Sequence, residues 1–302
     1  MKKRAIFICG PTAVGKTEVS LKLAEWLDTE IISFDSRQFF KELHIGAAPP
    51  SIEEQQRVPH HFVGHLSVKQ EYNAGDFEQD ALQKLEELFR TKQNVVLVGG
   101  SGLYMRALTD GFDDMPETDP NLRAGLNQEF LNHGLEALQK ELQQKDPDYY
   151  QKVDLQNPQR IIRALEVIRS TGKPFSSFRK SHKTKRSFQI LKIGMELPRT
   201  ELYQRINKRV ELMMRLGLEN EARQLLPFRN AHALQTVGYK ELFHYFDGEY
   251  DLKKAISEIQ KNSRRYAKRQ MTWFKRDAEI SWFSPYNLAA IQSHIIKMWD
   301  KD

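Results

Sequence analysis

The segment GPTAVGKT, residues 10–17, constrains the fold of this chain more than any other part of the sequence. Its glycine spacing, followed by a lysine and a threonine, is that of a phosphate-binding loop, in which backbone N–H groups surround an anion. The apolar run at residues 5–9 predicts a buried strand before the loop, and residues 17–27 have the periodicity of a helix. A strand, this loop and a helix in that order predict a parallel α/β fold. An accidental glycine-rich turn is the alternative, which the flanking elements disfavour.

The loop residues have separate expected parts in holding a phosphate or diphosphate. The Lys16 side chain supplies positive charge, and the Thr17 hydroxyl is a candidate ligand for Mg²⁺. The dipole of the following helix favours an anion at the same place. The candidate diphosphate- or nucleotide-binding residues are Gly10, Pro11, Thr12, Ala13, Val14, Gly15, Lys16 and Thr17.

Two other loops are candidates for the catalytic groups. Most ATPases with this kind of loop have an acidic residue at the end of another strand, yet the apolar run at 95–98 ends in Gly99, Gly100, Ser101 and Gly102. The apolar run that does end in an acid is 30–35, so Asp35 is a candidate general base at the carboxyl edge of the sheet. A turn or cap role for Asp35, and a plain strand-to-helix turn around Ser101, are the alternatives.

The character of the chain changes after residue 114. Helix-start signals with proline at the first helical position occur at Asp119, Asp146 and Asn157, with a stop expected near Gly134, and strand-like composition returns only at residues 188–197. We therefore predict a P-loop NTPase-like parallel sheet flanked by helices, formed by residues 1–114 and 188–302, with a helical C-terminal part. A helical insertion domain is predicted at residues 115–187, and helix breaks at Gly217 and Gly238.

Composition narrows the class of protein. The chain is 40% hydrophobic and 28% charged with no long apolar segment, so we expect no membrane association. Cys9 is the only cysteine, which excludes an intramolecular disulfide and fits a cytoplasmic protein. Adjacent His60 and His61 would point to opposite faces of a strand, which argues against a shared metal.

The net charge of +6 is concentrated in part in residues 260–276, QKNSRRYAKRQMTWFKR, which contain no acidic residue. Interleaved basic and aromatic side chains suit a nucleic-acid backbone and its bases, although a solvated amphipathic helix is the alternative. Arg160 and Arg163 share one face at the start of a helix in the insertion. Basic groups in both parts of the chain indicate a polyanionic ligand.

Together, these motifs resemble the tRNA dimethylallyltransferases, the bacterial tRNA isopentenyltransferases. The matching segments are GPTAVGKT, DSRQFF, HIGAAPP, VPHHF, YNAGDF, VGGSGLY, NPQRIIRALEVIRSTGKP and RRYAKRQMTWFKRD, in the same order from Gly10 to Asp277. The resemblance implies transfer of a dimethylallyl group from dimethylallyl diphosphate to N6 of the adenosine that follows the tRNA anticodon, with Mg²⁺ and release of diphosphate. The implied partners are the tRNA anticodon stem-loop and dimethylallyl diphosphate, and we expect a monomer.

The resemblance also implies roles for single residues. Asp35 matches the base near the adenine amine, Ser101 stands where the family usually has threonine, and Lys16 with its loop matches the diphosphate site. Arg37 departs from the smaller or neutral residue expected there, so its role stays open. The implied tRNA-binding residues are Asp35, Ser36, Arg37, Gln38, Ser101, Arg123, Gln159, Arg160, Ile161, Ile162, Arg163, Gln235, Thr236, Val237, Gly238, Tyr239, Lys240, Lys268, Arg269, Gln270, Thr272, Trp273 and Lys275.

Three other functions remain open from the sequence. A nucleoside or nucleotide kinase would use a phosphate-binding loop, an aspartate base and a helical lid equally well. A prenyltransferase that acts on free adenine nucleotides and a non-catalytic RNA-binding NTP switch are the others. The basic clusters and the helical insertion favour a polynucleotide acceptor.

Overall fold

The computed structural model describes residues 2–113, 115–179 and 183–299. The chain divides into two compact units: one contains the residues up to Thr109 and from Lys185 onward, and the other is Asp110–Thr184. The boundaries expected from the sequence lie near residues 115 and 187. Residue 114, the predicted end of the first core segment, lies outside the described residues.

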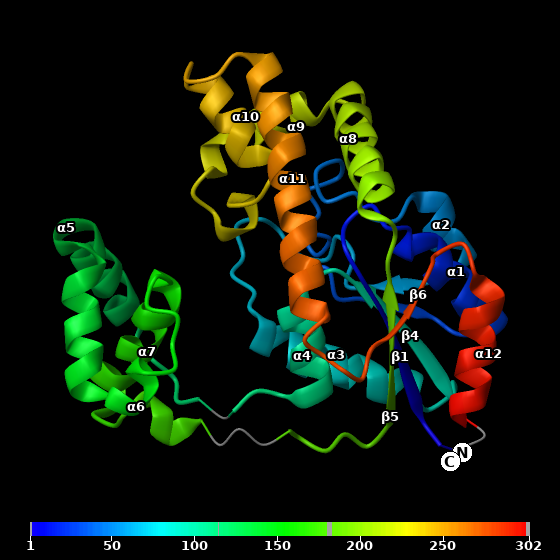
Figure 1. Ribbon diagram of the computed structural model, residues 1–302, viewed down its shortest axis with the longest axis horizontal. Coiled ribbons are helices and arrows are strands. Elements are labelled where there is room, and N and C mark those ends of the chain that lie inside the picture. The colour runs from blue at the N-terminus through cyan, green and yellow to red at the C-terminus, as the bar shows by residue number, and fades with distance from the viewer. Residues whose placement is uncertain (1, 114, 180–182, 300–302) are drawn as a thin grey trace. The chain divides into compact units, whose positions relative to one another are not determined.

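The first unit is built on a sheet of six parallel strands in the order β3-β2-β4-β1-β5-β6 (Figure 1). The strands are β1 (Arg4–Cys9), β2 (Ile31–Ser33), β3 (His60–His61), β4 (Asn94–Gly99), β5 (Gln189–Met195) and β6 (Ser281–Phe283). This confirms the predicted parallel α/β sheet. Because β4 lies between β1 and β2, the loops that follow these three strands meet at one carboxyl edge, where ligands of open α/β folds bind.

The β6 strand is a correction to the prediction that the C-terminal part is helical. The strand has three residues and pairs with β5 at the edge of the sheet. Three residues are too few to display an alternating pattern, and the pairing that defines β6 comes from a partner distant in sequence.

Helices cover both faces of the sheet because successive strand residues point to opposite sides. Phe7 packs with residues of α3 and α4 in one core cluster, whereas Ile6 and Ile8 pack with α1 and α12 in the other. At the ends of α1 and α12, Trp26 stacks on Trp299 with ring centroids 6.1 Å apart. The helices around the sheet are α1 (Lys16–Trp26), α2 (Ile52–Arg57), α3 (Ala74–Leu88), α4 (Gly102–Asp110) and α12 (Leu288–Trp299).

Four further helices belong to the C-terminal part of the same unit: α8 (Arg199–Arg215), α9 (Leu218–Gln224), α10 (Tyr239–Phe246) and α11 (Leu252–Phe274). The long helix α11, orange in Figure 1, packs against both α8 and α10. Gly217 and Gly238 precede α9 and α10 with φ of 100° and 104°, so both predicted breaks are confirmed.

The second unit contains α5 (Pro120–Lys145), α6 (Pro147–Tyr150) and α7 (Pro158–Thr171) around an apolar core of its own. Asp119, Asp146 and Asn157 each accept a backbone N–H at the start of a helix, which confirms the predicted helix starts. The stop expected near Gly134 is confirmed: Gly134 has non-helical backbone angles, with φ of 76°, and the kink there separates two helical parts of α5. Across the ranges described, no helix is both long and apolar enough to cross a bilayer.

Candidate active site

The segment GPTAVGKT connects β1 to α1 in a conformation that needs its glycines. Gly10 and Gly15 have φ of 148° and 107°, and Ala13 lies in the left-handed region at 63°. A Cβ atom on Gly10 would lie 2.7 Å from the Met195 carbonyl oxygen, so no side chain fits there. The sequence places glycine where the backbone bends most tightly and where β5 approaches.

The Lys16 side chain folds back over this loop. Its Nζ donates to the carbonyl oxygens of Gly10 at 3.0 Å and Pro11 at 2.9 Å. Burial lowers the pKa of Lys16 to about 8, and the attraction of the Asp35 carboxylate opposes that shift. No side chain caps the N-terminus of α1. Two carbonyl oxygens therefore hold Lys16 where an anion in the loop would meet it.

Asp35 and Ser101 come from different strands and lie at the same edge. The Asp35 carboxylate accepts the backbone N–H of Arg37 at 3.1 Å. The neighbouring Ser36 N–H donates to Ser101 Oγ at 3.0 Å, and the Ser101 hydroxyl donates to Ser36 Oγ at 3.1 Å. The structure thus brings the two candidate catalytic residues into adjoining, hydrogen-bonded loops.

Arg37 is held by backbone groups of the C-terminal part. Its guanidinium donates to the carbonyl oxygens of His232 and Ala233, each at 3.1 Å. Burial lowers the pKa of Arg37 from its usual value, and nearby Tyr266 and Asp35 oppose the shift. The side chain that departed from the family pattern therefore joins the loop after β2 to the segment that precedes α10.

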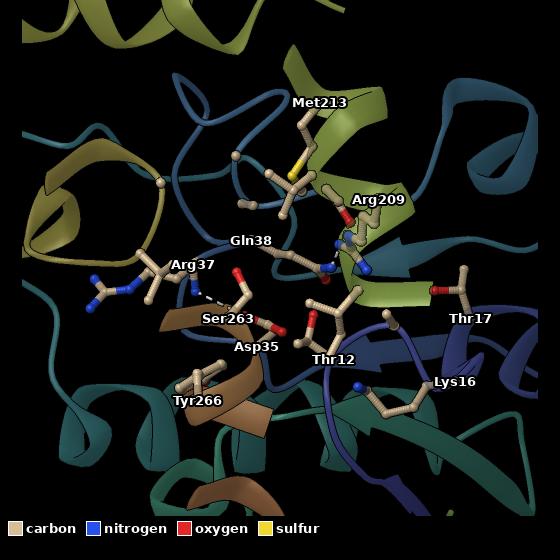
Figure 2. Close-up of a pocket in the computed structure, with 18 of the residues that line it drawn as sticks. Thr12, Lys16, Thr17, Asp35, Arg37, Gln38, Arg209, Met213, Ser263 and Tyr266 are labelled. Atoms are coloured by element: carbon tan, nitrogen blue, oxygen red, sulfur yellow. Dashed lines mark hydrogen bonds between the residues drawn. The ribbon is translucent and has the colours of Figure 1, made fainter. Parts of the chain in front are cut away.

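A pocket of about 340 Å³ opens between these loops and the C-terminal helices (Figure 2). Its polar lining includes Lys16, Thr17, Asp35, Gln38 and a residue that sequence reasoning missed, Arg209 of α8. Burial lowers the pKa of Arg209, and the Asp35 carboxylate opposes that shift. Arg205 and Arg209 are four residues apart on one helical face, which was a visible signal, but nothing in the sequence connected that helix with the phosphate-binding loop.

The opposite part of the same pocket is apolar. Figure 2 shows the Met213 side chain directed into it from α8. Other apolar lining residues include Val210, Leu218, Val237 and Ile259. One pocket therefore combines the GPTAVGKT loop, four cationic side chains, a carboxylate and an apolar wall.

Tyr266 of α11 is a second residue that sequence reasoning did not assign to the site. It lines the pocket near Asp35, and its hydroxyl interacts with Ser101. Burial and the Asp35 carboxylate raise the pKa of Tyr266 to about 12. Because Tyr266 lies in a basic segment, its ring was expected at the surface. In the structure the ring of Tyr266 lines the pocket.

The exposed side of α11 carries a basic groove of about 400 Å³, lined by Arg265, Lys268, Arg269, Thr272, Trp273 and Arg276. Four of the residues implied in tRNA binding therefore line the same groove: Lys268, Arg269, Thr272 and Trp273. Two others lie differently: Lys275 pairs with Glu196 at 2.7 Å and lies over the Trp282 ring. Gln270 is buried, and its amide is hydrogen-bonded inside the protein.

The segment from Gln235 to Lys240 has mixed positions. Thr236, Val237 and Gly238 line the pocket, and Gln235 and Lys240 are exposed. Tyr239 is buried, and its hydroxyl donates to the Glu221 carboxylate at 2.6 Å. Glu221 also accepts the Ile45 N–H at 2.7 Å, so this pair supports the HIGAAPP loop from behind.

In the second unit, several of the implied residues gather around a buried carboxylate. Arg123 and Arg163 approach Glu166 at 3.4 and 3.1 Å, and Arg123 also donates to Gln159 at 3.3 Å. Arg160 is exposed beside them. The side chains of Ile161 and Ile162 are fully buried in the core of the unit and do not reach the surface.

Candidate metal ligands other than Thr17 are sparse among the described residues. Within the described ranges, no group of three or more histidine, cysteine, aspartate or glutamate side chains could hold a metal ion. The His60 ring contacts the Val58 carbonyl oxygen at 2.7 Å, and His61 pairs with Glu30 at 2.6 Å. His60 also lines the pocket. The adjacent histidines thus have separate partners.

The sequence is similar to a known family along most of its length. The model of the family described as IPP transferase matches residues 38–277. A tRNA dimethylallyltransferase of Christiangramia forsetii is 54% identical over 283 residues, which are 94% of each chain. One of Cytophaga hutchinsonii is 48% identical and covers 98% of this chain and 97% of its own.

Solved structures have the same fold. The full-length tRNA isopentenylpyrophosphate transferase of Bacillus halodurans has a TM-score of 0.74 and 35% identity, covering 99% of this chain and 98% of its own. A eukaryotic dimethylallyltransferase acting on tRNA has a TM-score of 0.80 and 25% identity, covering 95% of this chain and 75% of its own. With the family model, these likenesses show that the chain belongs to the IPP transferase family.

Proposed function

We propose that this protein transfers a dimethylallyl group from dimethylallyl diphosphate to N6 of the adenosine that follows the anticodon of tRNA. The observation that carries the proposal is the pocket, in which Lys16 and Arg209 adjoin an apolar wall that includes Met213. Such a pocket suits a ligand with a diphosphate at one end and a short hydrocarbon at the other. Asp35 lines the same pocket, within reach of the junction.

The acceptor is proposed to be a polynucleotide for two reasons. The relatives named above are tRNA dimethylallyltransferases, and a solved neighbour acts on tRNA. The groove on α11 presents Arg265, Lys268, Arg269 and Arg276 together with Trp273, a combination that suits RNA phosphates and bases. To enter a pocket of this kind, the target base must leave the anticodon-loop stack.

The residues of the pocket suggest how the reaction proceeds. The N6 amine attacks the first carbon of the dimethylallyl group, the carbon–oxygen bond breaks, and its electron pair leaves with the diphosphate. Asp35 accepts the proton that the amine loses. Lys16, Arg209 and the N–H groups of the loop neutralise the charge that develops on the leaving diphosphate. The apolar wall holds the allyl group in place and excludes water from the reacting carbon.

Thr17 is the residue that we propose to hold Mg²⁺. Its side chain lines the pocket beside the loop, and a hydroxyl oxygen is a suitable ligand for this hard cation. Mg²⁺ is usually bound through one or two protein groups together with substrate phosphates and water, so a cluster of carboxylates is not required. When bound, the ion would add positive charge beside the diphosphate.

The proposal is tested by incubating the protein with an unmodified anticodon stem-loop, dimethylallyl diphosphate and Mg²⁺, followed by digestion to nucleosides and mass spectrometry. The expected product is adenosine that has gained one five-carbon unit. A stem-loop with guanosine at the target position is the matched control and should gain nothing. Unchanged adenosine, together with ATP-dependent phosphorylation of a nucleoside, would establish the kinase alternative instead.

An assay with AMP as the acceptor tests the remaining alternative, a prenyltransferase that acts on free adenine nucleotides. If AMP were prenylated as fast as the stem-loop, the acceptor would be a free nucleotide and the groove on α11 would have no part in recognition. We expect the stem-loop to react and AMP to react at least about a hundredfold more slowly, because AMP cannot use the phosphate contacts of that groove.

We also propose that the active protein is a monomer. Residues of a single chain are sufficient to supply both the cationic side chains and the apolar wall of the pocket. Activity should therefore be proportional to protein concentration, and sedimentation should give the mass of a single 35.3 kDa chain. A dimer that loses activity on dilution would contradict this part of the proposal.

A further inference from the structure

Gln270 of α11 holds two loops of the sheet edge together. Its Oε1 accepts the backbone N–H of Thr12 at 2.9 Å, and its Nε2 donates to the carbonyl oxygen of Gly100 at 2.9 Å. A backbone N–H only donates and a carbonyl only accepts, so these partners fix the orientation of the amide. The residue is 6% exposed. One glutamine thus joins the phosphate-binding loop, the loop after β4 and α11.

The space around this amide is closely fitted. A Cβ atom built on Gly100 would lie 2.4 Å from Gln270 Nε2. The amide therefore occupies the place where a side chain at position 100 would begin. Glycine at this position allows the glutamine to reach across to Thr12.

The neighbouring residues of α11 face elsewhere. Lys268, Arg269 and Thr272 are exposed and line the basic groove, whereas Gln270 is buried against the loops. Successive residues of a helix are rotated by about 100°, so the same helix presents one face to solvent and another to the phosphate-binding loop. The resemblance placed Gln270 among the tRNA contacts, but its side chain does not reach that surface.

The phosphate-binding loop depends on bonds of this kind. Gly10, Ala13 and Gly15 all have positive φ, and Ala13 in particular takes a conformation that is unfavourable for a residue with a Cβ. A loop with such a backbone keeps its shape only when its surroundings hold it. The Thr12 N–H bonded to Gln270 lies between Gly10 and Ala13, in the middle of the unusual conformation.

We propose that Gln270 is a positioning residue for the diphosphate site: it holds the phosphate-binding loop in its anion-binding shape and makes no contact with RNA. The inference rests on the proposed function only in that the loop binds a diphosphate. Without the glutamine amide, the Thr12 N–H and the Gly100 carbonyl lose their buried partner, and the loop can relax into conformations that direct fewer N–H groups at the anion.

The test compares Gln270→Met with Gln260→Met. Methionine keeps the length of the side chain and removes both hydrogen bonds, and Gln260 lies on the same helix with one 3.5 Å contact, to Glu211. Binding of inorganic pyrophosphate is measured by titration calorimetry, and binding of an anticodon stem-loop by fluorescence anisotropy. Gln270→Met should bind pyrophosphate about tenfold more weakly and the stem-loop within about twofold of the wild type. Gln260→Met should change neither.

A second variant keeps the test decisive if Gln270→Met does not fold. Gly100→Ala displaces only the end of the Gln270 side chain, since the new Cβ would meet its Nε2. It should therefore reproduce the loss of pyrophosphate affinity with a melting temperature near that of the wild type.

Three results would contradict the inference. Unchanged pyrophosphate affinity in both variants would show that the loop keeps its shape without the glutamine. A selective loss of stem-loop affinity would make Gln270 an RNA contact. If the wild-type protein did not bind pyrophosphate, there would be no diphosphate site for Gln270 to position. That result would contradict the proposed function as well as this inference.

Discussion

The Ser101 hydroxyl accepts the backbone N–H of Ser36 at 3.0 Å and donates to Ser36 Oγ at 3.1 Å. These residues are 65 positions apart in sequence and belong to the loops that follow β4 and β2. Ser36 is adjacent to Asp35, the proposed base. One serine side chain therefore fixes the backbone that presents the carboxylate.

Ser101→Ala should lower the rate of transfer about tenfold or more, because the loop of Asp35 loses its anchor and the Ser36 N–H loses a partner. Ser101→Thr keeps the hydroxyl and should remain near the wild-type rate. Single-turnover measurement with saturating substrates checks both. Equal rates for Ser101→Ala and the wild type would remove this role from the hydroxyl.

Asp35→Asn distinguishes the role of Asp35 in proton transfer from its role as a hydrogen-bond acceptor in the loop. The asparagine side-chain oxygen can still accept the Arg37 N–H that Asp35 accepts at 3.1 Å, but it cannot take a proton from the amine. The turnover rate should fall by about 10² to 10⁴, while stem-loop affinity, measured by anisotropy, stays close to that of the wild type. Full turnover in this variant would show that another group is the base.

Arg209→Gln should raise the KM for dimethylallyl diphosphate by about tenfold to a hundredfold, because a half-buried cation that lines the pocket is lost. Arg215→Gln is the matched control on the same helix, since Arg215 is exposed and pairs with Glu211 at 4.0 Å. Steady-state kinetics with varied diphosphate checks both variants. Equal KM values would place Arg209 outside the diphosphate site.

Neutralising Lys268 and Arg269 should weaken stem-loop binding and flatten its dependence on salt, by a slope of about one for each lost phosphate contact. Lys275→Gln should flatten it less, because Lys275 already pairs with Glu196 at 2.7 Å. Anisotropy titrations at several salt concentrations measure the slopes. If Lys275→Gln had the largest effect, the RNA path would not follow the groove.

Cys9 should be unreactive in the folded protein. It is fully buried at the end of β1, and burial raises the pKa of its thiol to about 12. At pH 8 almost none of it is thiolate, the form that reacts with iodoacetamide. Mass spectrometry should show no labelling under native conditions and complete labelling in guanidinium chloride. Rapid labelling of the native protein would mean that the end of β1 opens.

Local patterns in the sequence were sufficient for much of the fold. The GPTAVGKT segment requires a strand before it and a helix after it, and both are present as β1 and α1. The helix starts at Asp119, Asp146 and Asn157 depend on a side chain that caps its own helix, so they too are visible locally. Short β6 was not predicted, because it is defined by pairing with β5, a strand that is distant in sequence.

The candidate site divides in the same way. The glycines, Lys16 and Thr17 are close in sequence, and their spacing by itself determines a phosphate-binding loop. The parallel order of the sheet then brings Asp35 and Ser101 to the same edge, which could be expected from strands that end in polar residues. The placement of α8 and α11 over that edge could not, since helix packing depends on side chains far apart in the chain.

The sequence by itself determined the family, the phosphate-binding loop and the parallel sheet, because each is recognised from residues at short and regular spacing. Only the tertiary structure decided which charged and amide side chains turn inward. Arg209 lines the pocket and Gln270 accepts a hydrogen bond from the phosphate-binding loop, whereas Lys275 pairs with Glu196 at the surface. The physical reason is that the apolar periodicity of a helix indicates which face is buried, but not the element on which that face packs. The packing partner decides which polar side chains at the edge of that face meet the loops of the sheet.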